Sequence, residues 1–292
     1  MRVGCDLPYF EDPGEIRTFV EGVEELGYHH LGYSEHVAAG AATAYPPGFS
    51  FTDPWHETVS LTGFLCGVTS AIELNPAMLL VTLRHPVLIA KQLAELDLLS
   101  QGRLRVGVSV GWNREEQVAL GVDPSRRGDR LDEMLPLMRQ LWEEEEVTAT
   151  GPEYALARVA IHPRPKRHIP LWLGGGGLGN QGEPPERGLR RAARHGDGFK
   201  LMAPTGIDPA RAIELAERLH RYAEEEGRTI GVEARIITHV TPADEWASVI
   251  ARYRDSGVIT HVGLGNRIAG GSVDQQLALV RDVVERTRSE WD

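Results

Sequence analysis

The chain has 292 residues, enough for one large domain with a sizeable core, and its two cysteines lack the number and spacing of a disulfide framework or a metal site. The formal net charge of -11 argues against a nucleic-acid-binding surface, which would need clustered Lys and Arg. The chain begins directly with a strand-like segment and contains no apolar run of membrane length, so we expect a cytoplasmic protein without a membrane anchor.

Strand-like and helical segments alternate from the start of the chain. A first strand is expected at residues 2–7, and the helix after it carries apolar residues at helical spacing up to Gly27. A second strand at 30–34 leads into a long loop at 37–53, and a loop of that length inside a compact domain is usually functional. Asp53 and the proline after it predict the start of the second helix, with Asp as its cap.

The same alternation continues to the end of the chain. Further strands are expected at residues 72–81, 104–112, 169–173, 198–202, 232–240 and 258–264, with helical patterns between them and an excursion of β character at 147–166. Eight strands alternating with helices are typical of a (β/α)8 barrel, or TIM barrel, here as a single domain over residues 1–292 with insertions. A doubly wound open sheet is the alternative.

The strand expected at 104–112 has small residues on one face and ends on Gly-Trp. Gly107, Ser109 and Gly111 alternate with valines, as expected for a strand with two different faces. In a closed barrel, small inward residues leave space near the end of the strand, where active sites gather. The pattern is equally compatible with a buried strand whose glycines only permit close packing.

Two ionisable positions could carry chemistry. Glu35 and His36 stand where the second strand should end, and a histidine there titrates near neutral pH, which suits a proton donor or acceptor. A structural histidine is the competing interpretation. Lys200 lies within the strand at 198–202 and would be costly to bury unpaired. It could face a ligand anion or form a salt bridge to a neighbouring strand.

A glycine-rich run at 174–179 matches G-x-G-x-x-G, but the next helix begins several residues later. This spacing favours a barrel-type phosphate nest, in which backbone N–H groups converge on an anion, over a Rossmann loop. Of the arginines on the helix that follows, Arg187 in the first turn is placed for the barrel mouth. We interpret Arg190, Arg191 and Arg194 as a solvated face.

A metal-hydrolase site is not expected. The first strand carries Cys5-Asp6-Leu7 where a His-x-His pair would be needed. His29 and His30 are adjacent, so in a strand they point to opposite faces and do not easily share a metal ion.

Several stretches together resemble the bacterial luciferase-like monooxygenase superfamily, and most closely its coenzyme F420-dependent branch. They are Tyr33-Ser34-Glu35-His36, Leu83-Arg84-His85-Pro86 with Ala90-Lys91-Gln92, Leu98-Leu99-Ser100-Gln101-Gly102-Arg103-Leu104, Val106-Gly107-Val108-Ser109-Val110-Gly111-Trp112, Arg127-Gly128 with Asp132-Glu133, and Ile169-Pro170-Leu171-Trp172-Leu173-Gly174-Gly175. They span nearly the whole chain in one order. The resemblance implies a (β/α)8 barrel that binds a flavin or deazaflavin at its mouth.

The resemblance also implies roles for individual residues. The flat ring would lie against a bulge with a non-proline cis peptide at Ala77-Met78. Its other neighbours would be Ser34, Glu35, His36, Val110, Gly111 and Trp112, with the phosphate on Gly175, Gly176 and Gly177. Phe199-Lys200 departs from the family's more common Trp and apolar pair, and this departure could reflect contact of Lys200 with an anionic cofactor tail. A carboxylate often stands in F420-dependent sugar-phosphate dehydrogenases where this chain has Trp112, which argues against that substrate class.

These expectations lead to three functional hypotheses. In the first, the protein is an F420-dependent oxidoreductase that transfers a hydride between the deazaflavin and a small organic substrate under the loop at 37–53. His36 would supply or accept the proton, Glu35 would tune it, and aromatic residues would shape the substrate side. Those aromatic residues are Tyr45, Phe49, Phe51 and Trp55.

The second hypothesis keeps the fold and changes the cofactor. It is an FMN-dependent monooxygenase that uses O2 and reduced flavin from a separate reductase. The third is a noncatalytic flavin-binding relative. Under each hypothesis the resemblance implies a homodimer, and none calls for nucleic acid or a membrane as a partner.

Overall fold

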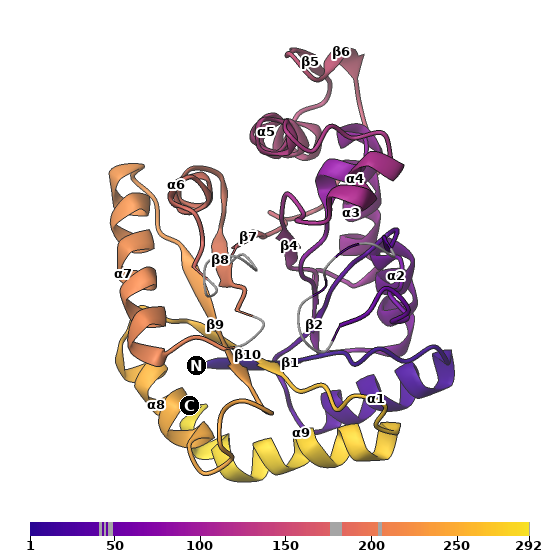
Figure 1. The fold of residues 1–292 in the computed structure, drawn as a ribbon. Helices are drawn as coiled ribbons and strands as arrows, with labels where there is room; N and C mark the ends of the chain where they lie inside the picture. Colours follow the sequence, from indigo (N-terminus) through magenta and orange to yellow (C-terminus); the bar gives the residue numbers. More distant parts are fainter. Residues whose placement is uncertain (41–42, 44, 46–48, 176–182, 204–205, 292) are drawn as a thin grey trace.

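The computed structural model describes residues 1–291 apart from 41–42, 44, 46–48, 176–182 and 204–205. Within these residues, eight parallel strands form a nearly closed barrel in the order β3-β2-β1-β10-β9-β8-β7-β4 (Figure 1). Two isolated parallel bridges, Leu74 to Leu104 and Leu79 to Val108, join the β3 and β4 ends. The predicted (β/α)8 barrel is confirmed, because an open sheet would leave those two ends apart.

The described elements have the following bounds. The barrel strands are β1 (Arg2–Asp6), β2 (His30–Tyr33), β3 (Glu73–Pro76), β4 (Val106–Val108), β7 (Leu171–Gly175), β8 (Gly198–Leu201), β9 (Gly231–Ile237) and β10 (His261–Gly265). The helices are α1 (Pro13–Glu25), α2 (Thr58–Val68), α3 (Pro86–Leu99), α4 (Arg114–Ala119), α5 (Arg127–Glu143), α6 (Glu186–His195), α7 (Pro209–Glu225), α8 (Trp246–Asp255) and α9 (Val273–Thr287), with short 3-10 turns η1 (Val81–Leu83) and η2 (Arg288–Glu290). None of these helices is long and apolar enough to cross a membrane.

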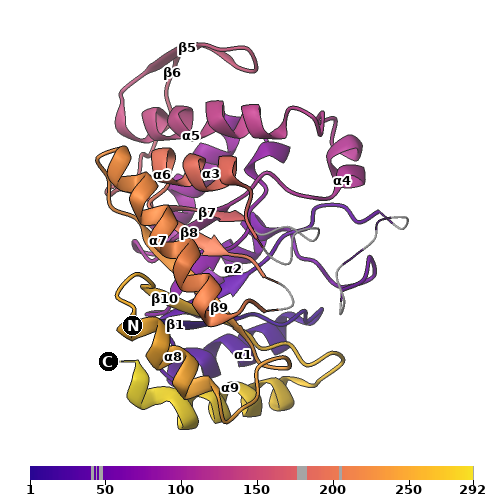
Figure 2. The same ribbon diagram turned by 60° about the vertical axis from the view of Figure 1, so that its left-hand side comes forward.

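The outer helices form where the sequence supplies a cap and an apolar stripe. In α1 the Asp12 carboxylate accepts hydrogen bonds from the backbone N–H groups of Gly14 and Glu15, and Pro13 occupies the first turn. The apolar residues of α1 recur at helical spacing and are buried against the barrel, among them Phe19 and Val23. Figure 2 shows the remaining helices around the same barrel.

The predicted start of the second helix is wrong. Helix α2 begins at Thr58, and Glu57 caps it by accepting a hydrogen bond from the Ser60 N–H. Asp53 instead accepts a hydrogen bond from the Ser50 N–H and forms an ion pair with Arg267. The Asp53 carboxylate therefore stabilises the loop after β2 and does not cap helix α2.

Two other segments differ from the predicted elements, the strand expected at 72–81 and helix α4, whereas the β character expected at 147–166 is confirmed. The strand expected at 72–81 ends at Pro76 and continues as a bulge in which the Ala77–Met78 peptide is cis. The excursion at 147–166 is an antiparallel hairpin of β5 (Val147–Thr150) and β6 (Ala155–Val159), which lies outside the barrel (Figure 1). Helix α4 was not expected at all, and it supplies a residue to the site described next.

Candidate active site

A cavity of about 750 Å³ opens where the barrel strands end. Its size is within the usual range for a small-molecule or cofactor site. Most predicted site residues line it: Ser34, Glu35, His36, Met78, Val110, Gly111, Trp112 and Gly175. Gly176 and Gly177 lie outside the described residues. The cavity lies at the strand ends because residues at or after the ends of β1, β2, β3, β4, β7 and β8 all line it.

The imidazole of His36 is held by a carboxylate that is distant in the sequence, that of Glu116. Its Nδ1 lies 3.0 Å from Oε2 of Glu116 on α4, and Glu116 is almost fully buried. The other carboxylate oxygen accepts hydrogen bonds from the backbone N–H groups of Val37 and Ala38. Since an ionised carboxylate only accepts, Nδ1 carries the proton, which leaves Nε2 as the proton-accepting nitrogen of the neutral ring.

Glu35 was predicted to tune His36, and its carboxylate is bound by Arg84. The Arg84 guanidinium binds both Glu35 oxygens, at 2.8 and 2.5 Å, and the Leu80 N–H donates to the same carboxylate. Arg84 also forms an ion pair with Glu57. Glu35 therefore ties the end of β2 to the segment after the cis peptide, and its charge is neutralised by Arg84.

Glycines allow the cavity walls to approach closely at two points. A Cβ at Gly107 would lie 2.6 Å from the Ala77 Cβ, so this glycine serves close packing. Gly111 lines the cavity. Its φ is +73°, a backbone conformation that residues with a side chain rarely adopt. Ala77 was predicted to contact the cofactor, but it is buried and does not line the cavity. Met78 does line the cavity.

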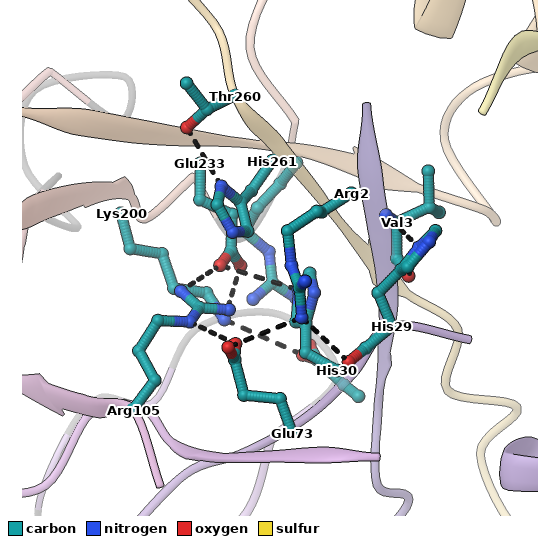
Figure 3. Close-up of polar contacts among 12 residues, drawn as sticks. Arg2, Val3, His29, His30, Glu73, Arg105, Lys200, Glu233, Thr260 and His261 are labelled. Carbon is teal, nitrogen blue, oxygen red and sulfur yellow. Dashed lines mark hydrogen bonds and ion pairs between the residues drawn. The ribbon is translucent and has the colours of Figure 1, made fainter. Parts of the chain in front are cut away.

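Lys200 is likewise placed away from the cavity. Its side chain is 1% exposed, inside the barrel, with Nζ 2.9 Å from Oε1 of Glu233 (Figure 3). Arg105 and His30 face the same carboxylate at 2.9 and 3.5 Å. The salt bridge, one of the two interpretations of Lys200, is the arrangement found. Burial alone would raise the pKa of Glu233, but the charges of Lys200 and Arg105 hold it well below its usual range.

Arginines line the outer part of the cavity. They come from the start of α5 and from α6: Arg127, Arg187, Arg190, Arg191 and Arg194. The last three were predicted to form a solvated face, yet they also border the cavity while pairing with acidic residues. Arg191 binds Asp132 of α5 at 2.6 Å, so it bridges the two helices at the cavity wall.

Sequence reasoning missed Arg84 and Glu116. Arg84 stood within a stretch that carried the family resemblance, but nothing local indicated its partner. Asn113 followed three residues later by Glu116 is the signature of a helix start, and Asn113 does cap α4. The signature could have predicted the helix; the contact to His36 spans 80 residues and depends on the fold. Among the described residues, no group of three or more His, Cys, Asp or Glu could hold a metal ion.

The sequence profile of the luciferase-like monooxygenase family matches residues 1–286. The chain belongs to this family. The match covers nearly all of the barrel and confirms the resemblance carried by the stretches quoted above.

Individual relatives carry different activities in their names. An uncharacterized protein of Mycobacterium tuberculosis is 36% identical over 176 residues, covering 60% of this chain and 58% of the relative. The F420-dependent glucose-6-phosphate dehydrogenase of Kineococcus radiotolerans is 30% identical over 238 residues, covering 80% and 65%. Pyrimidine monooxygenase RutA of Cronobacter sakazakii is 27% identical over 203 residues, covering 68% and 57%. The matches thus span about three fifths of these relatives' lengths.

Solved structures share the fold of this chain. An F420-dependent secondary alcohol dehydrogenase in complex with an F420–acetone adduct has a TM-score of 0.76 at 16% identity, covering 98% of this chain and 99% of the other. Monooxygenase RslO1 of Streptomyces bottropensis has a TM-score of 0.75 at 18% identity, covering 100% of both chains. At such identities the likeness shows the shared fold alone.

Proposed function

We propose that this protein is an oxidoreductase that binds coenzyme F420 at the barrel mouth and acts on a small organic substrate there. The observation that carries the proposal is His36, whose Nδ1 is held by the buried Glu116 while the ring borders the cavity. Reduced F420 supplies a hydride when bound, and oxidised F420 accepts one. The family match and the names of relatives support this class of chemistry.

The residues around the cavity fit a flat ring with an anionic extension. Gly111 and Gly175 present backbone to the cavity, and a Cβ at the adjacent Gly174 would overlap the Met78 side chain. Arg127 and Arg187 line the same cavity, and Arg190, Arg191 and Arg194 border it while paired with acidic residues. F420 carries a phosphate and further carboxylates on its tail, whereas FMN carries the phosphate alone, so this wall favours F420.

His36 would move the proton that accompanies hydride transfer. With Nδ1–H donated to Glu116, Nε2 accepts a proton from a substrate hydroxyl in the oxidative direction and returns it in the reductive direction. The Glu116 carboxylate stabilises the positive charge that forms on the ring. Its bonds to the Val37 and Ala38 N–H groups also fix the start of the loop that borders the cavity.

Further parts of this proposal concern partners. A separate enzyme would reduce the cofactor between turnovers if the reaction consumes reduced F420. A homodimer in the cytoplasm stays a prediction from the resemblance.

Titration of the purified protein with F420 and with FMN tests the choice of cofactor. We expect F420 to bind at least about tenfold more tightly, because each additional charge-assisted contact contributes binding energy. Replacing Arg127 and Arg187 together by Gln should weaken F420 binding, whereas Arg286→Gln on the outer helix α9 should not.

Tighter binding of FMN would contradict the proposal and favour the monooxygenase alternative, which names of relatives such as RutA keep open. Tight F420 binding without turnover of any alcohol or carbonyl compound would favour the noncatalytic alternative.

A further inference from the structure

Aromatic side chains form a continuous wall around one part of the cavity. They follow β1, β2 and β4, and all of them line the cavity: Tyr9, His36, Tyr45, Phe49, Trp55 and Trp112. Successive rings touch. Tyr9 lies 4.3 Å from Trp55 between ring centres, and Phe49 stacks on Trp55 at 5.7 Å with an interplanar angle of 16°. The wall is therefore one surface assembled from three loops.

His36 stands between two indoles of this wall. Trp55 lies 4.6 Å and Trp112 5.4 Å from its ring centre, with interplanar angles of 82° and 83°. Tyr45 contacts Trp112 edge to face at 5.5 Å. Trp112 is 41% exposed, so a broad part of its indole surface remains available to a ligand. The proton-transfer group thus lies within an apolar, ring-lined space.

Charges on this side of the cavity already have partners. Among the described cavity-lining residues of these loops, the ionisable groups besides the tyrosines are Glu35 and His36, which are bound by Arg84 and Glu116. Burial raises the pKa of Tyr9, so its hydroxyl is neutral at physiological pH. The cation nearest to these rings, Arg267, lies 4.5 Å from the Tyr9 ring centre and is ion-paired with Asp53. A phosphate placed here would lose its hydration and compete with Asp53 for that cation, which is unfavourable.

The cationic side chains lie elsewhere in the same cavity. Arg187, Arg190 and Arg191 come from α6, whereas the aromatic wall adjoins α4 and the loop after β2. Figures 1 and 2 both show α6 well apart from α4. The cavity therefore has an arginine-lined part, assigned above to the anionic end of the cofactor, and a separate aromatic part.

We infer that the aromatic part binds an uncharged, flat, ring-containing substrate that presents one oxygen atom to Nε2 of His36, as a hydroxyl that donates to the neutral ring or as a carbonyl that accepts from the protonated ring. This inference rests on the proposed function for the identity of the site, and it goes further by excluding sugar phosphates and other anions as substrates. Aromatic faces bind flat apolar rings by offset stacking and edge-to-face contact, which the geometry of Trp55 and Trp112 offers from two sides.

Binding of two probes tests the inference without requiring turnover. Acetophenone serves as the uncharged aromatic carbonyl compound and glucose 6-phosphate as the anionic sugar. Each is titrated by ligand-observed NMR against the protein saturated with F420, or with FMN should that bind more tightly. We expect acetophenone to bind at least about tenfold more tightly than glucose 6-phosphate. Equal affinities, the reverse order, or no binding of acetophenone up to about 10 mM would overturn the inference.

Variants locate the binding. Trp55→Ala and Trp112→Ala should each weaken acetophenone binding by about tenfold, because each removes one face of the site. Phe51→Ala is the matched control: Phe51 belongs to the same loop but is 48% exposed and does not line the cavity, unlike the sequence prediction for it. Circular dichroism checks that each variant is folded. Because Trp112 is more exposed than Trp55, we expect its replacement to disturb the fold less. Unchanged affinity in folded Trp112→Ala would contradict the assignment.

The two proposals can fail separately. If neither cofactor supports turnover but acetophenone binds and depends on Trp112, the proposed function fails and the substrate class stands. If F420 binds tightly and glucose 6-phosphate is the better ligand, the proposed function stands and the substrate class fails.

Discussion

Ionisable side chains gather in two regions of this barrel, its interior and its mouth. In the interior, Lys200, Arg105 and His30 surround Glu233, and all four are at most 3% exposed (Figure 3). At the mouth, His36 is also paired with a buried carboxylate, but its ring borders a cavity. Burial and pairing are common to both regions, so neither identifies a functional residue. Access to a cavity at the strand ends separates them.

The interior cluster holds strands together. Lys200 on β8 pairs with Glu233 on the adjacent strand β9. The contacts of Glu233 with Arg105, immediately before β4, and with His30 on β2 cross the barrel. The Arg105 guanidinium also lies 4.4 Å from the Trp172 ring centre. Asp6 and Arg235 form a neighbouring ion pair. Cations and anions balance inside a closed barrel, which suits a structural role.

Replacing Glu233 should give the largest effect and would sharpen the contrast. Glu233→Gln leaves Lys200 buried without its closest carboxylate and removes one of the two carboxylates that bind Arg105. Breaking a buried ion pair in this way costs about 3–5 kcal/mol in the free energy of unfolding. Equilibrium unfolding in urea measures the loss.

The control for this variant is an exposed ion pair. Glu146 and Arg158 are 49% and 79% exposed, so Glu146→Gln should change the free energy of unfolding by less than about 1 kcal/mol. If Glu233→Gln were no more destabilising than this control, the interior cluster would not have the structural role assigned to it.

Replacing Glu116 tests the role of the ion pair at the barrel mouth, and enzymatic activity is the quantity measured. Glu116→Gln removes the carboxylate that orients His36 and should lower kcat by about 10–100-fold, with KM for the substrate changed little. Glu115→Gln, next along α4 and exposed, is the matched control and should keep wild-type kcat. A fall in kcat equal in both variants, or a change confined to KM, would show that Glu116 does not position the proton-transfer group.

The pH dependence of stability should come from two histidines at the interior cluster, the buried His30 and the partly exposed His261. Burial, with Arg105 adding to it, lowers the pKa of His261 from 6.5 to about 2, and burial also lowers the pKa of His30. Both are neutral in the folded protein, whereas in the unfolded chain they take up protons below about pH 6.5. The free energy of unfolding is therefore fully retained above about pH 6.5 and falls as the pH drops below it.

Each histidine contributes a slope of up to about 1.4 kcal/mol per pH unit. Urea unfolding of the wild type and of His261→Gln between about pH 7 and pH 5 measures the difference, and the variant should show the shallower slope. Identical slopes would mean that His261 is not held neutral by its surroundings.

The fold was predictable because strand and helix patterns are local. The periodicity of each segment and the glycines of β4 are read directly from neighbouring residues, as are caps such as Asp12. Asp53 misled the same reasoning, because its side chain contacts Arg267, 214 residues away, in place of its own helix start. Local capping rules consider only neighbouring residues, so they do not predict a contact with a residue that is distant in the sequence.

The candidate site was predictable in position but not in its partnerships. Strand ends located Glu35 and His36, and the resemblance located Met78 and Gly111. The sequence suggested Glu35 as the carboxylate that acts on His36. In the structure Glu35 forms an ion pair with Arg84, and His36 contacts the carboxylate of Glu116. Lys200 was considered for a ligand anion because its chemistry fits one, yet Glu233 on the adjacent strand neutralises it. Such pairings depend on which strands meet in the closed barrel.

The central claim is that His36 carries the proton transfer at the mouth while the interior cluster only supports the barrel. Turnover of His36→Ala, measured together with F420 binding, tests it most directly. We predict that the variant folds, binds F420 with wild-type affinity and loses about 10²–10⁴-fold in kcat, the range expected on removal of a general acid–base group. Wild-type kcat in His36→Ala would contradict the account.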